Sequence, residues 1–204
     1  MGHMKHIIFF DFDGVIVDSF AFCFKIVDSR EYITESEYRQ RFEGNVYDAT
    51  RKFKKPGTIV TDFFASYTPE LMKCEPIKEM VKAIKVLAQT YTLVIVSSTE
   101  TDPIDTYLRK CNLRQYFSEI LGSDVDRSKV NKIQQSLKLH DVEPQNSVFI
   151  TDTLGDIREA EKCHVASIAV LGGYHNLETL QKGNPLAIIK SGDELINAVE
   201  SYFN

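Results

Sequence analysis

Short apolar runs alternate along the chain with longer stretches in which apolar residues recur at helical spacing. Residues 7–10, 93–96 and 148–150 are runs of strand length, and polar residues follow each of them directly. Further strands are expected at residues 165–170 and 187–189. Amphipathic helices are expected around residues 77–88, 102–111, 130–137, 157–160 and 195–203. Continuous apolar strands separated by helices are typical of a parallel sheet with helices on both faces.

Residues 18–73 do not follow this alternation. No run of strand length stands out there, and Gly44, Pro56, Gly57 and Pro69 interrupt the segment. The segment is rich in Phe and Tyr, which we interpret as the core of a small helical insert. The sequence therefore predicts an α/β fold with a Rossmann-like three-layer α/β/α core and a mostly parallel sheet. Residues 1–17 and 74–204 form this core, and residues 18–73 form a small helical cap inserted after the first strand.

The insert also carries a group of basic residues. They are Arg39, Arg41, Arg51, Lys52, Lys54 and Lys55. A solvated helical face is the simpler interpretation, and a patch that attracts an anionic substrate is the alternative.

The composition is ordinary for a globular protein of 204 residues, with 43% apolar and 26% charged residues. With a net charge of −5, the chain has no excess of basic residues of the kind that binds nucleic acid. No apolar stretch has the length of a membrane span. No signal-peptide pattern opens the sequence, and the four cysteines are scattered without CxxC spacing. We therefore expect a cytoplasmic protein with reduced thiols, a monomer or homodimer, with neither a membrane nor a nucleic acid as partner.

Two carboxylates follow the first predicted strand, in the sequence Asp11-Phe12-Asp13-Gly14-Val15. Side chains two residues apart on a strand lean the same way, and a glycine lets the chain turn immediately afterwards. In open α/β sheets, ligands bind at the carboxyl ends of the strands. Buried carboxylates repel each other unless a positive charge compensates, and a divalent cation does so well.

Polar residues also follow two other predicted strands. Ser97 and Ser98 follow residues 93–96, while Asp152 and Asp156 follow residues 148–150. Because parallel strands end at the same edge of a sheet, all these groups can converge on one site. Several carboxylates around one point suit Mg²⁺, which keeps waters and substrate phosphate as its remaining ligands. Asp156 capping the next helix, and Ser98 opening a loop, are the simpler alternatives for those two residues.

A lysine near this edge would supply the positive charge for a phosphate. Lys129, which precedes a predicted helix, is our candidate, and Lys132 is its rival.

Together these residues resemble the motifs of the haloacid dehalogenase (HAD)-like hydrolase superfamily, in its phosphoglycolate-phosphatase-like branch. The four motifs correspond to residues 11–15 with Asp18 and Ser19, residues 93–97, Lys129, and the acidic DxxxD form at residues 151–156. Residues 172–175 are similar to a recurring loop of that branch. The resemblance covers residues 5–17 and 74–203, and the insert lies where the family carries its C1-type helical cap.

The resemblance implies a Mg²⁺-dependent phosphatase that acts on a small phosphorylated metabolite through an aspartyl-phosphate intermediate. Asp11 would be the nucleophile, and Asp13 would protonate the leaving oxygen and then activate the hydrolytic water. Lys129 would join them as a catalytic residue, and would bind the non-bridging phosphate oxygens together with Ser97 and the Ser98 backbone N–H.

The resemblance also implies a set of metal ligands. Asp11, Asp13 through its backbone carbonyl, and Asp152 would hold Mg²⁺, with Asp156 as a further ligand or as a residue that orients one.

Other functions remain open at this point. A phosphomutase uses the same residues and differs mainly in how its cap excludes water. A phosphonatase would need a Schiff-base lysine in the insert, for which Lys52, Lys54 and Lys55 are candidates. A dehalogenase would need neither the metal nor Asp13 and is disfavoured. From another class, a non-catalytic module that binds Mg²⁺ or phosphate for regulation is opposed by the intact set of Asp11, Asp13, Ser97, Lys129 and Asp152. A phosphoaspartate receiver domain is opposed because its phospho-acceptor lies on an internal strand rather than the first, and because it would not need this insert.

Overall fold

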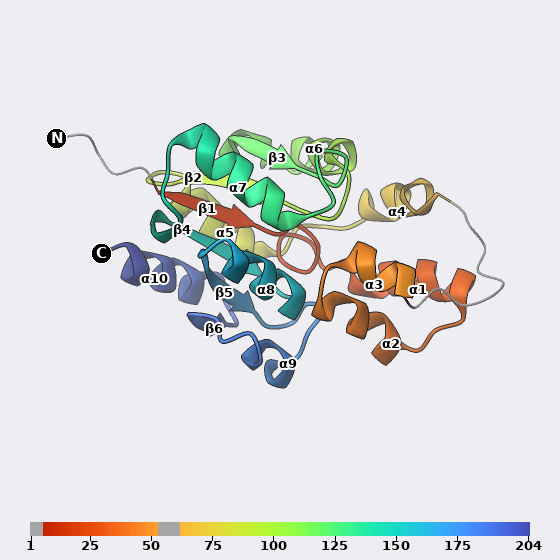
Figure 1. The fold of residues 1–204 in the computed structure, drawn as a ribbon. Helices are drawn as coiled ribbons and strands as arrows, with labels where there is room; N and C mark the ends of the chain where they lie inside the picture. Colours follow the sequence, from red (N-terminus) through yellow and green to blue (C-terminus); the bar gives the residue numbers. More distant parts are fainter. Residues whose placement is uncertain (1–5, 53–61) are drawn as a thin grey trace.

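The computed structural model describes residues 6–52 and 62–204, and within them six parallel strands form one sheet (Figure 1). The strand order is β3-β2-β1-β4-β5-β6. The strands are β1 (Ile7–Phe10), β2 (Thr92–Val96), β3 (Glu119–Leu121), β4 (Ser147–Thr151), β5 (Ala166–Val170) and β6 (Ala187–Ile189). Parallel neighbours require crossover connections, and helices supply them. The predicted α/β class with a parallel sheet is confirmed.

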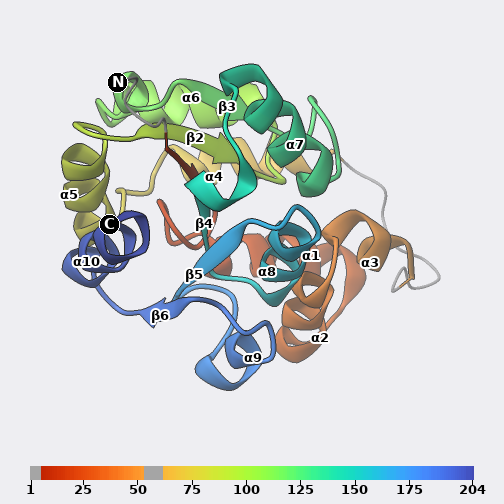
Figure 2. The same ribbon diagram turned by 60° about the vertical axis from the view of Figure 1, so that its left-hand side comes forward.

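Helices cover both faces of the sheet. One face carries α5 (Lys78–Leu87), α6 (Thr101–Lys110) and α10 (Gly192–Phe203), and the other carries α7 (Lys129–His140) and α8 (Leu154–Lys162). Figure 2 shows α5 and α10 together on one side, with α7 and α8 on the opposite side. The remaining short elements of this part are η2 (Arg114–Tyr116), η3 (Pro144–Asn146) and α9 (Leu177–Gln181). The result is a three-layer α/β/α arrangement.

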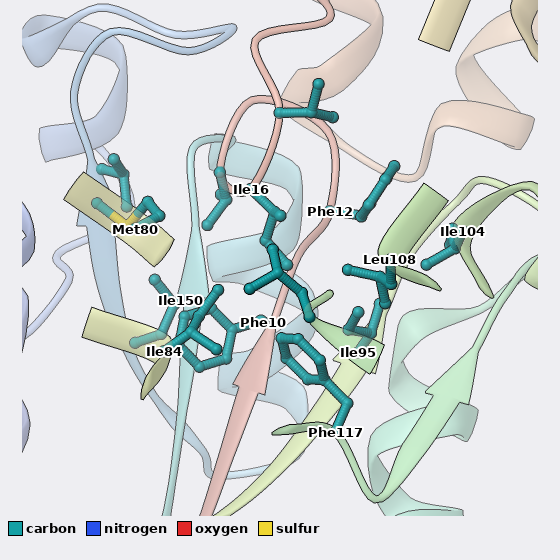
Figure 3. Packing of buried hydrophobic residues seen from close by; sticks show 14 of the residues in the cluster. Phe10, Phe12, Ile16, Met80, Ile84, Ile95, Ile104, Leu108, Phe117 and Ile150 are labelled. Atoms are coloured by element: carbon teal, nitrogen blue, oxygen red, sulfur yellow. The ribbon is translucent and has the colours of Figure 1, made fainter. Parts of the chain in front are cut away.

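The central strand β1 is buried on both faces. Ile8 and Phe10 belong to the apolar cluster under α5, α6 and α10, whereas Ile7 and Phe9 belong to the cluster under α7 and α8. Figure 3 shows Phe10 packed among side chains of neighbouring elements, including Ile84, Ile95 and Phe117. Burial on both faces explains why the run is apolar without alternation.

Between residues 20 and 71, the regular elements of the described chain are all helices. They are α1 (Phe20–Glu31), α2 (Glu35–Gln40), η1 (Arg41–Glu43), α3 (Val46–Lys52) and α4 (Phe63–Leu71). A capping box starts α2, because Thr34 Oγ1 accepts a hydrogen bond from the Glu37 backbone and the Glu37 carboxylate accepts one from the Thr34 backbone. In Figure 1 these helices lie beyond the carboxyl ends of the strands, on the right. The division into a core of residues 1–17 and 74–204 and a cap of residues 18–73 remains a prediction.

The described part of the insert shares its buried apolar residues with the main core. Cys23, Val27, Tyr38 and Tyr67 belong to the same buried cluster as Phe10 of β1. Aromatic rings of the insert also pack on one another, for example Phe24 on Tyr38 and Phe63 on Tyr67, so the aromatic packing of the insert is continuous with the main core.

The cysteines and the helix lengths bear on two expectations from the sequence. All four cysteines are free thiols, as the scattered spacing predicts. Among the described residues, no helix has the length and apolar character needed to cross a membrane.

Candidate active site

A tight turn follows β1 and presents its two carboxylates. The Asp11 backbone donates to Ile150 O of β4 at 2.9 Å, which continues the sheet pairing one residue beyond the strand. The Gly14 backbone then donates to Val17 O at 2.8 Å with a positive φ of 75° at Gly14, a conformation that glycine adopts without steric cost. The sequence-predicted turn at Gly14 is therefore present, directly after Asp11 and Asp13.

Lys129 lies between two of the predicted acidic residues. Its Nζ is 2.9 Å from Asp11 Oδ2 and 2.7 Å from Asp156 Oδ2. Thr151 Oγ1 also donates to Asp156 Oδ2, at 2.8 Å. Lys129 is the first residue of α7, whose N-cap Ser128 accepts a hydrogen bond from the Asn131 backbone. The start of α7, the end of β1 and the first turn of α8 thus bring one ammonium and two carboxylates into direct contact.

This contact changes the protonation behaviour of all three groups. Burial raises the pKa of the Asp11 carboxyl well above its usual range, although the Lys129 ammonium opposes the shift. Burial also disfavours an ammonium, but the carboxylates of Asp11 and Asp156 outweigh it and raise the pKa of Lys129. For Asp156 the ammonium of Lys129 overcomes the effect of burial, so the pKa of Asp156 lies below its usual range. The three groups therefore form a tightly coupled set in which Lys129 stays charged.

Asp152 follows β4 and is completely buried. Its Oδ2 accepts a hydrogen bond from the Tyr174 backbone at 2.6 Å. Its Oδ1 is also buried and has no hydrogen-bond partner among the described residues. Burial raises the pKa of Asp152 to about 7, and the charge of Asp156 adds to the shift. A buried carboxylate oxygen without a partner is costly, so it marks a position that a cation would stabilise.

The loop after β2 holds the predicted serines. The Ser97 backbone donates to Leu121 O of β3, and Ser97 Oγ accepts a hydrogen bond from the Thr99 backbone at 3.0 Å. Lys132 Nζ donates to Ser97 O at 2.5 Å and to Gly122 O at 3.2 Å. Burial, reinforced by the charge of Lys129, lowers the pKa of Lys132 to about 8. Lys132 therefore supports the backbone of this loop, whereas Lys129 is the lysine next to Asp11.

Both carboxylate oxygens of Asp13 accept hydrogen bonds from residues that the sequence did not single out. Tyr67 of α4 donates from its hydroxyl to Asp13 Oδ1 at 2.8 Å, and Thr99 Oγ1 donates to Oδ2 at 2.7 Å. Thr99 lies two residues after Ser97, so its position after a strand end was a signal that could have been used. Tyr67 comes from the insert, and no sequence pattern connects it with Asp13.

A cavity of about 400 Å³ lies between the insert and the sheet edge. The predicted residues that line it are Asp11, Asp13, Ser97, Ser98, Lys129 and Asp156. Asp152 does not line it. Aromatic side chains of the insert form much of the remaining wall, among them Phe42, Tyr47, Phe63, Phe64 and Tyr67. The structure therefore brings the predicted polar groups to one cavity and adds an apolar wall opposite them.

Two of the basic residues of the insert, Arg39 and Arg41, have side chains that the structure describes. Arg41 is 3% exposed, lines the cavity and pairs with Glu31 at 2.5 Å. Arg39 pairs with Glu35, stacks over the Phe20 ring and donates to carbonyl oxygens of the loop before α9. The interpretation as a solvated face is wrong for Arg41, because its charge is neutralised inside the protein. Lys54 and Lys55, and the side chains of Arg51 and Lys52, lie outside the described residues.

The predicted metal ligands can be tested against these contacts. Over residues 6–52 and 62–204, no group of three or more Asp, Glu, His or Cys side chains is gathered as a ready-made metal site. The side-chain oxygens of Asp13 are occupied by Tyr67 and Thr99. The unpartnered Oδ1 of Asp152 nevertheless fits a divalent cation, which would stabilise a buried carboxylate oxygen that has no hydrogen-bond donor. Burial raises the pKa of Asp11 even with the Lys129 ammonium beside it, so further positive charge would stabilise the ionised form of Asp11 as well.

Comparisons with known proteins agree with this architecture. The sequence model described as haloacid dehalogenase-like hydrolase matches residues 8–170. A phosphoglycolate phosphatase from Synechococcus elongatus is 23% identical over 203 residues, which cover 94% of this chain and 96% of the relative. A second phosphoglycolate phosphatase, from Vibrio vulnificus, is 25% identical over 145 residues, or 69% of this chain and 63% of the relative.

Solved structures show the same fold. A haloacid dehalogenase-like family hydrolase from Streptococcus pneumoniae superposes with a TM-score of 0.77 at 19% identity, over 98% of this chain and 99% of the other. A hydrolase from Pseudomonas syringae has a TM-score of 0.78 at 15% identity, over 97% of this chain and 99% of the other. At these identities the likeness concerns the fold alone.

Proposed function

The chain belongs to the haloacid dehalogenase-like hydrolase family, whose sequence model spans most of it, and on this basis we propose that it is a Mg²⁺-dependent phosphatase that hydrolyses a small phosphorylated metabolite. The predicted family and the predicted hydrolase activity are thus confirmed. The metal, the intermediate and the substrate are parts of the proposal.

The observation that carries the proposal is the position of Lys129 between Asp11 and Asp156, at 2.9 and 2.7 Å. An ammonium that stays charged beside a strand-end carboxylate can hold a phosphoryl group within reach of that carboxylate. Asp11 would attack the phosphorus, forming a bond from its carboxylate oxygen as the bond to the leaving oxygen breaks. Lys129, with Ser97 and the Ser98 backbone N–H, would bind the non-bridging oxygens.

Asp13 would act first as the general acid and then as the general base. It would donate a proton to the leaving oxygen in the first step and take one from the attacking water in the second. In the described arrangement both of its oxygens accept hydrogen bonds, which suits the form that activates water.

Asp11, Asp152 and the backbone carbonyl of Asp13 would hold Mg²⁺, and Asp156 would either join them or orient them. When bound, the cation would offset the buried negative charge and let an anionic carboxylate approach an anionic phosphate. The buried Oδ1 of Asp152, unpartnered among the described residues, supports this assignment.

The relatives named phosphoglycolate phosphatase support phosphoglycolate as one substrate to test, along with other small phosphate esters. The division into a core and a cap at residues 18–73, the cytoplasmic location and a monomeric or homodimeric state belong to the same proposal. A phosphomutase remains the second candidate. It would use the same polar residues, and the apolar wall of the cavity could exclude water from the reaction.

The first experiment measures phosphate release from 4-nitrophenyl phosphate, with Mg²⁺ and after chelation, for the wild type and Asp11→Asn. Removal of the nucleophile is expected to lower kcat by a factor of about 10⁴ or more, since the covalent route is then closed. Asp102→Asn makes the same chemical change at an exposed position of α6 and serves as the control.

Each result has a defined meaning. Metal-dependent turnover that Asp11→Asn abolishes and Asp102→Asn retains would support the proposal. Substantial turnover by Asp11→Asn would show that Asp11 is not the nucleophile. A folded wild-type protein that releases no phosphate but interconverts phosphosugar isomers would instead be a phosphomutase.

A further inference from the structure

The acid/base candidate Asp13 is held from two sides of the molecule. Thr99, from the loop after β2, donates to Oδ2, and Tyr67, from α4 of the insert, donates to Oδ1. The two donors come from separate parts of the fold and engage different oxygens of one carboxyl group. The plane of that carboxyl is therefore fixed by both, and removing either donor leaves one oxygen without its hydrogen bond.

The ring of Tyr67 is itself held firmly. The residue is 0% exposed, and its ring stacks on Phe63 at 5.5 Å and meets Phe64 and Phe22 at 5.9 and 5.5 Å. These neighbours come from α1 and α4, so they fix the position of the hydroxyl relative to the insert. Burial and the nearby charge of Asp13 raise the pKa of Tyr67 well above its usual range. The hydroxyl therefore remains protonated and acts as a donor.

We propose that Tyr67 is a positioning residue for the reaction, which orients the Asp13 carboxyl toward the leaving oxygen and thereby makes acid catalysis depend on the packing of the insert. This inference rests on the proposed function, in which Asp13 is the proton donor. Tyr67 itself does not react. Its effect on proton transfer passes through the Asp13 carboxyl, to which it donates.

The proton balance of the step shows where orientation matters. As the bond from phosphorus to the leaving oxygen breaks, the leaving oxygen takes the proton of the Asp13 carboxyl, and Asp11 forms its new bond to phosphorus. Asp13 is then ionised, and in the second step it takes a proton from the attacking water as the water oxygen bonds to phosphorus. The bond from phosphorus to the Asp11 oxygen breaks, which releases phosphate and regenerates the Asp11 carboxylate. Tyr67 keeps its proton throughout and donates a hydrogen bond to Oδ1. A carboxyl that rotates away from the leaving oxygen would leave that oxygen to depart as an anion.

The dependence on leaving group follows directly. An alkoxide is a poor leaving group and needs the proton, whereas 4-nitrophenolate leaves readily without it. The value of kcat/KM covers all steps up to departure of the leaving group, so it reports this effect even where the second step limits kcat. Loss of a positioning residue should therefore affect alkyl phosphates far more than activated aryl phosphates.

The test compares benzyl phosphate with 4-nitrophenyl phosphate, which both carry one ring, for the wild type and Tyr67→Phe. We expect kcat/KM to fall about tenfold to a hundredfold for benzyl phosphate, within the range of general acid catalysis, and less than about threefold for 4-nitrophenyl phosphate. Tyr107→Phe is the matched control, because Tyr107 is also fully buried but packs on Phe12 outside the cavity. For Tyr107→Phe, the ratio of kcat/KM for benzyl phosphate to kcat/KM for 4-nitrophenyl phosphate should equal the wild-type ratio.

A rescue variant separates positioning from packing. Tyr67→4-aminophenylalanine keeps the ring and restores an N–H donor, so it should return the ratio toward the wild-type value. If Tyr67→Phe fails to fold, Tyr67→Met takes its place, because Met also fills apolar space without a donor and should show the same selective loss on benzyl phosphate. Equal losses on both substrates, or an unchanged ratio in Tyr67→Phe, would overturn the inference.

Asp13→Asn distinguishes this failure from failure of the proposed function. If Asp13→Asn shows the strong leaving-group dependence and Tyr67→Phe does not, Asp13 is the acid and only the role of Tyr67 is wrong. If neither variant shows it, Asp13 is not the proton donor and the proposed mechanism fails with it.

Discussion

At the scale of single residues, the backbone packs unusually closely against the Asp152 carboxylate. A Cβ atom at Gly14 or at Gly173 would clash with the Asp152 carboxylate, so both glycines let the backbone come close to this acid. One carboxylate oxygen is occupied by the Tyr174 backbone and the other is buried without a described partner. This shell leaves one oxygen available to a small cation and excludes larger groups.

We therefore expect Mg²⁺ to stabilise the wild type against heat through Asp152. At a Mg²⁺ concentration about a hundred times the Kd, binding to the native state alone adds about 2.7 kcal/mol, which corresponds to roughly 5–10 °C in Tm for a chain of this size. Asp152→Asn should lose most of that shift, because an amide oxygen is a weaker ligand than a carboxylate. Differential scanning calorimetry with and without Mg²⁺ measures both shifts.

Asp102→Asn again provides the control, since it should keep the full Mg²⁺ shift. An equal shift in Asp152→Asn and in the wild type would show that Mg²⁺ acts at another place, such as the acidic surface. This readout does not depend on turnover, so it tests the metal assignment separately from the reaction.

The choice between Lys129 and Lys132 shows what the sequence could not decide at this scale. Both residues follow the same loop, and both are buried, at 3% and 0% exposed. They lie three positions apart on α7, so their side chains leave the same side of the helix. Only the three-dimensional structure shows that Lys129 reaches Asp11 while Lys132 reaches backbone oxygens. The signals that did work, the acids and serines after strands, depend only on position along the chain.

At the scale of elements, His175 connects three of them. Its Nδ1 accepts a hydrogen bond from the Leu154 backbone at the start of α8, and its Nε2 lies 2.9 Å from Arg39 O of α2. Its backbone donates to Asp152 O at the end of β4. Since Nδ1 accepts, the ring proton is assigned to Nε2, which donates to Arg39 O. A neutral imidazole therefore joins the insert to the sheet edge.

The stability of this connection should depend on pH. Burial lowers the pKa of His175 below its usual range near 6.5, so between the folded and unfolded values the unfolded state binds more protons. The stabilising contribution is therefore complete above about pH 7 and is lost as the pH falls through the folded value. We expect the difference in unfolding free energy between the wild type and His175→Gln to shrink below about pH 6.5.

Urea unfolding of the metal-free proteins at several pH values between 5 and 8 measures that difference. His164→Asn is the control, because His164 is exposed and has a positive φ that Asn tolerates. A difference that stays constant across this range would show that His175 titrates alike in both states.

The elements themselves were predictable where the apolar pattern is long. The strands at β1, β2 and β4 and the helices α5 and α10 lie where the sequence places them, within a few residues. Strand β3 was not predicted, because its three residues, Glu119–Leu121, give no readable alternation. Helix α9 is only Leu177–Gln181 and has one buried residue, Leu180, so it shows no helical spacing of apolar residues.

One turn signal in the insert was misleading. Pro69 suggested an interruption, yet α4 continues through it to Leu71. Tertiary packing outweighs the lost hydrogen bond there, because Tyr67 and Leu71 on either side are both completely buried.

At the scale of the whole molecule, the insert and the core share an apolar cluster and enclose a cavity of about 400 Å³ between them. Polar groups of the sheet edge line one part of that cavity, and aromatic side chains of the insert line another. No periodicity of the sequence reveals this arrangement, because it depends on how α1 to α4 pack against the strand ends. The cavity, of about 400 Å³, leaves space beyond a phosphate for an apolar leaving group.

The aromatic lining of the cavity therefore predicts that alkyl phosphates with a phenyl ring are better substrates than small alkyl phosphates. Burying a phenyl ring contributes about 1.5–3 kcal/mol, so kcat/KM for 2-phenylethyl phosphate should exceed that for ethyl phosphate roughly tenfold to a hundredfold. Both substrates release a simple alkanol, so the comparison isolates contact with the wall from the chemistry of departure. Steady-state kinetics of phosphate release with each ester gives the ratio.

Two Phe→Ala variants test whether the cavity wall is the cause of that preference. Phe42 lines the cavity, so Phe42→Ala should reduce the ratio, because the bound phenyl ring then loses contact area with the wall. Phe24 packs on Phe20 and Tyr38 without lining the cavity, so Phe24→Ala should keep the ratio even if it lowers stability. If both variants change the ratio equally, the preference comes from general packing of the insert. If the wild type prefers ethyl phosphate, the cavity holds its leaving group away from these aromatic side chains.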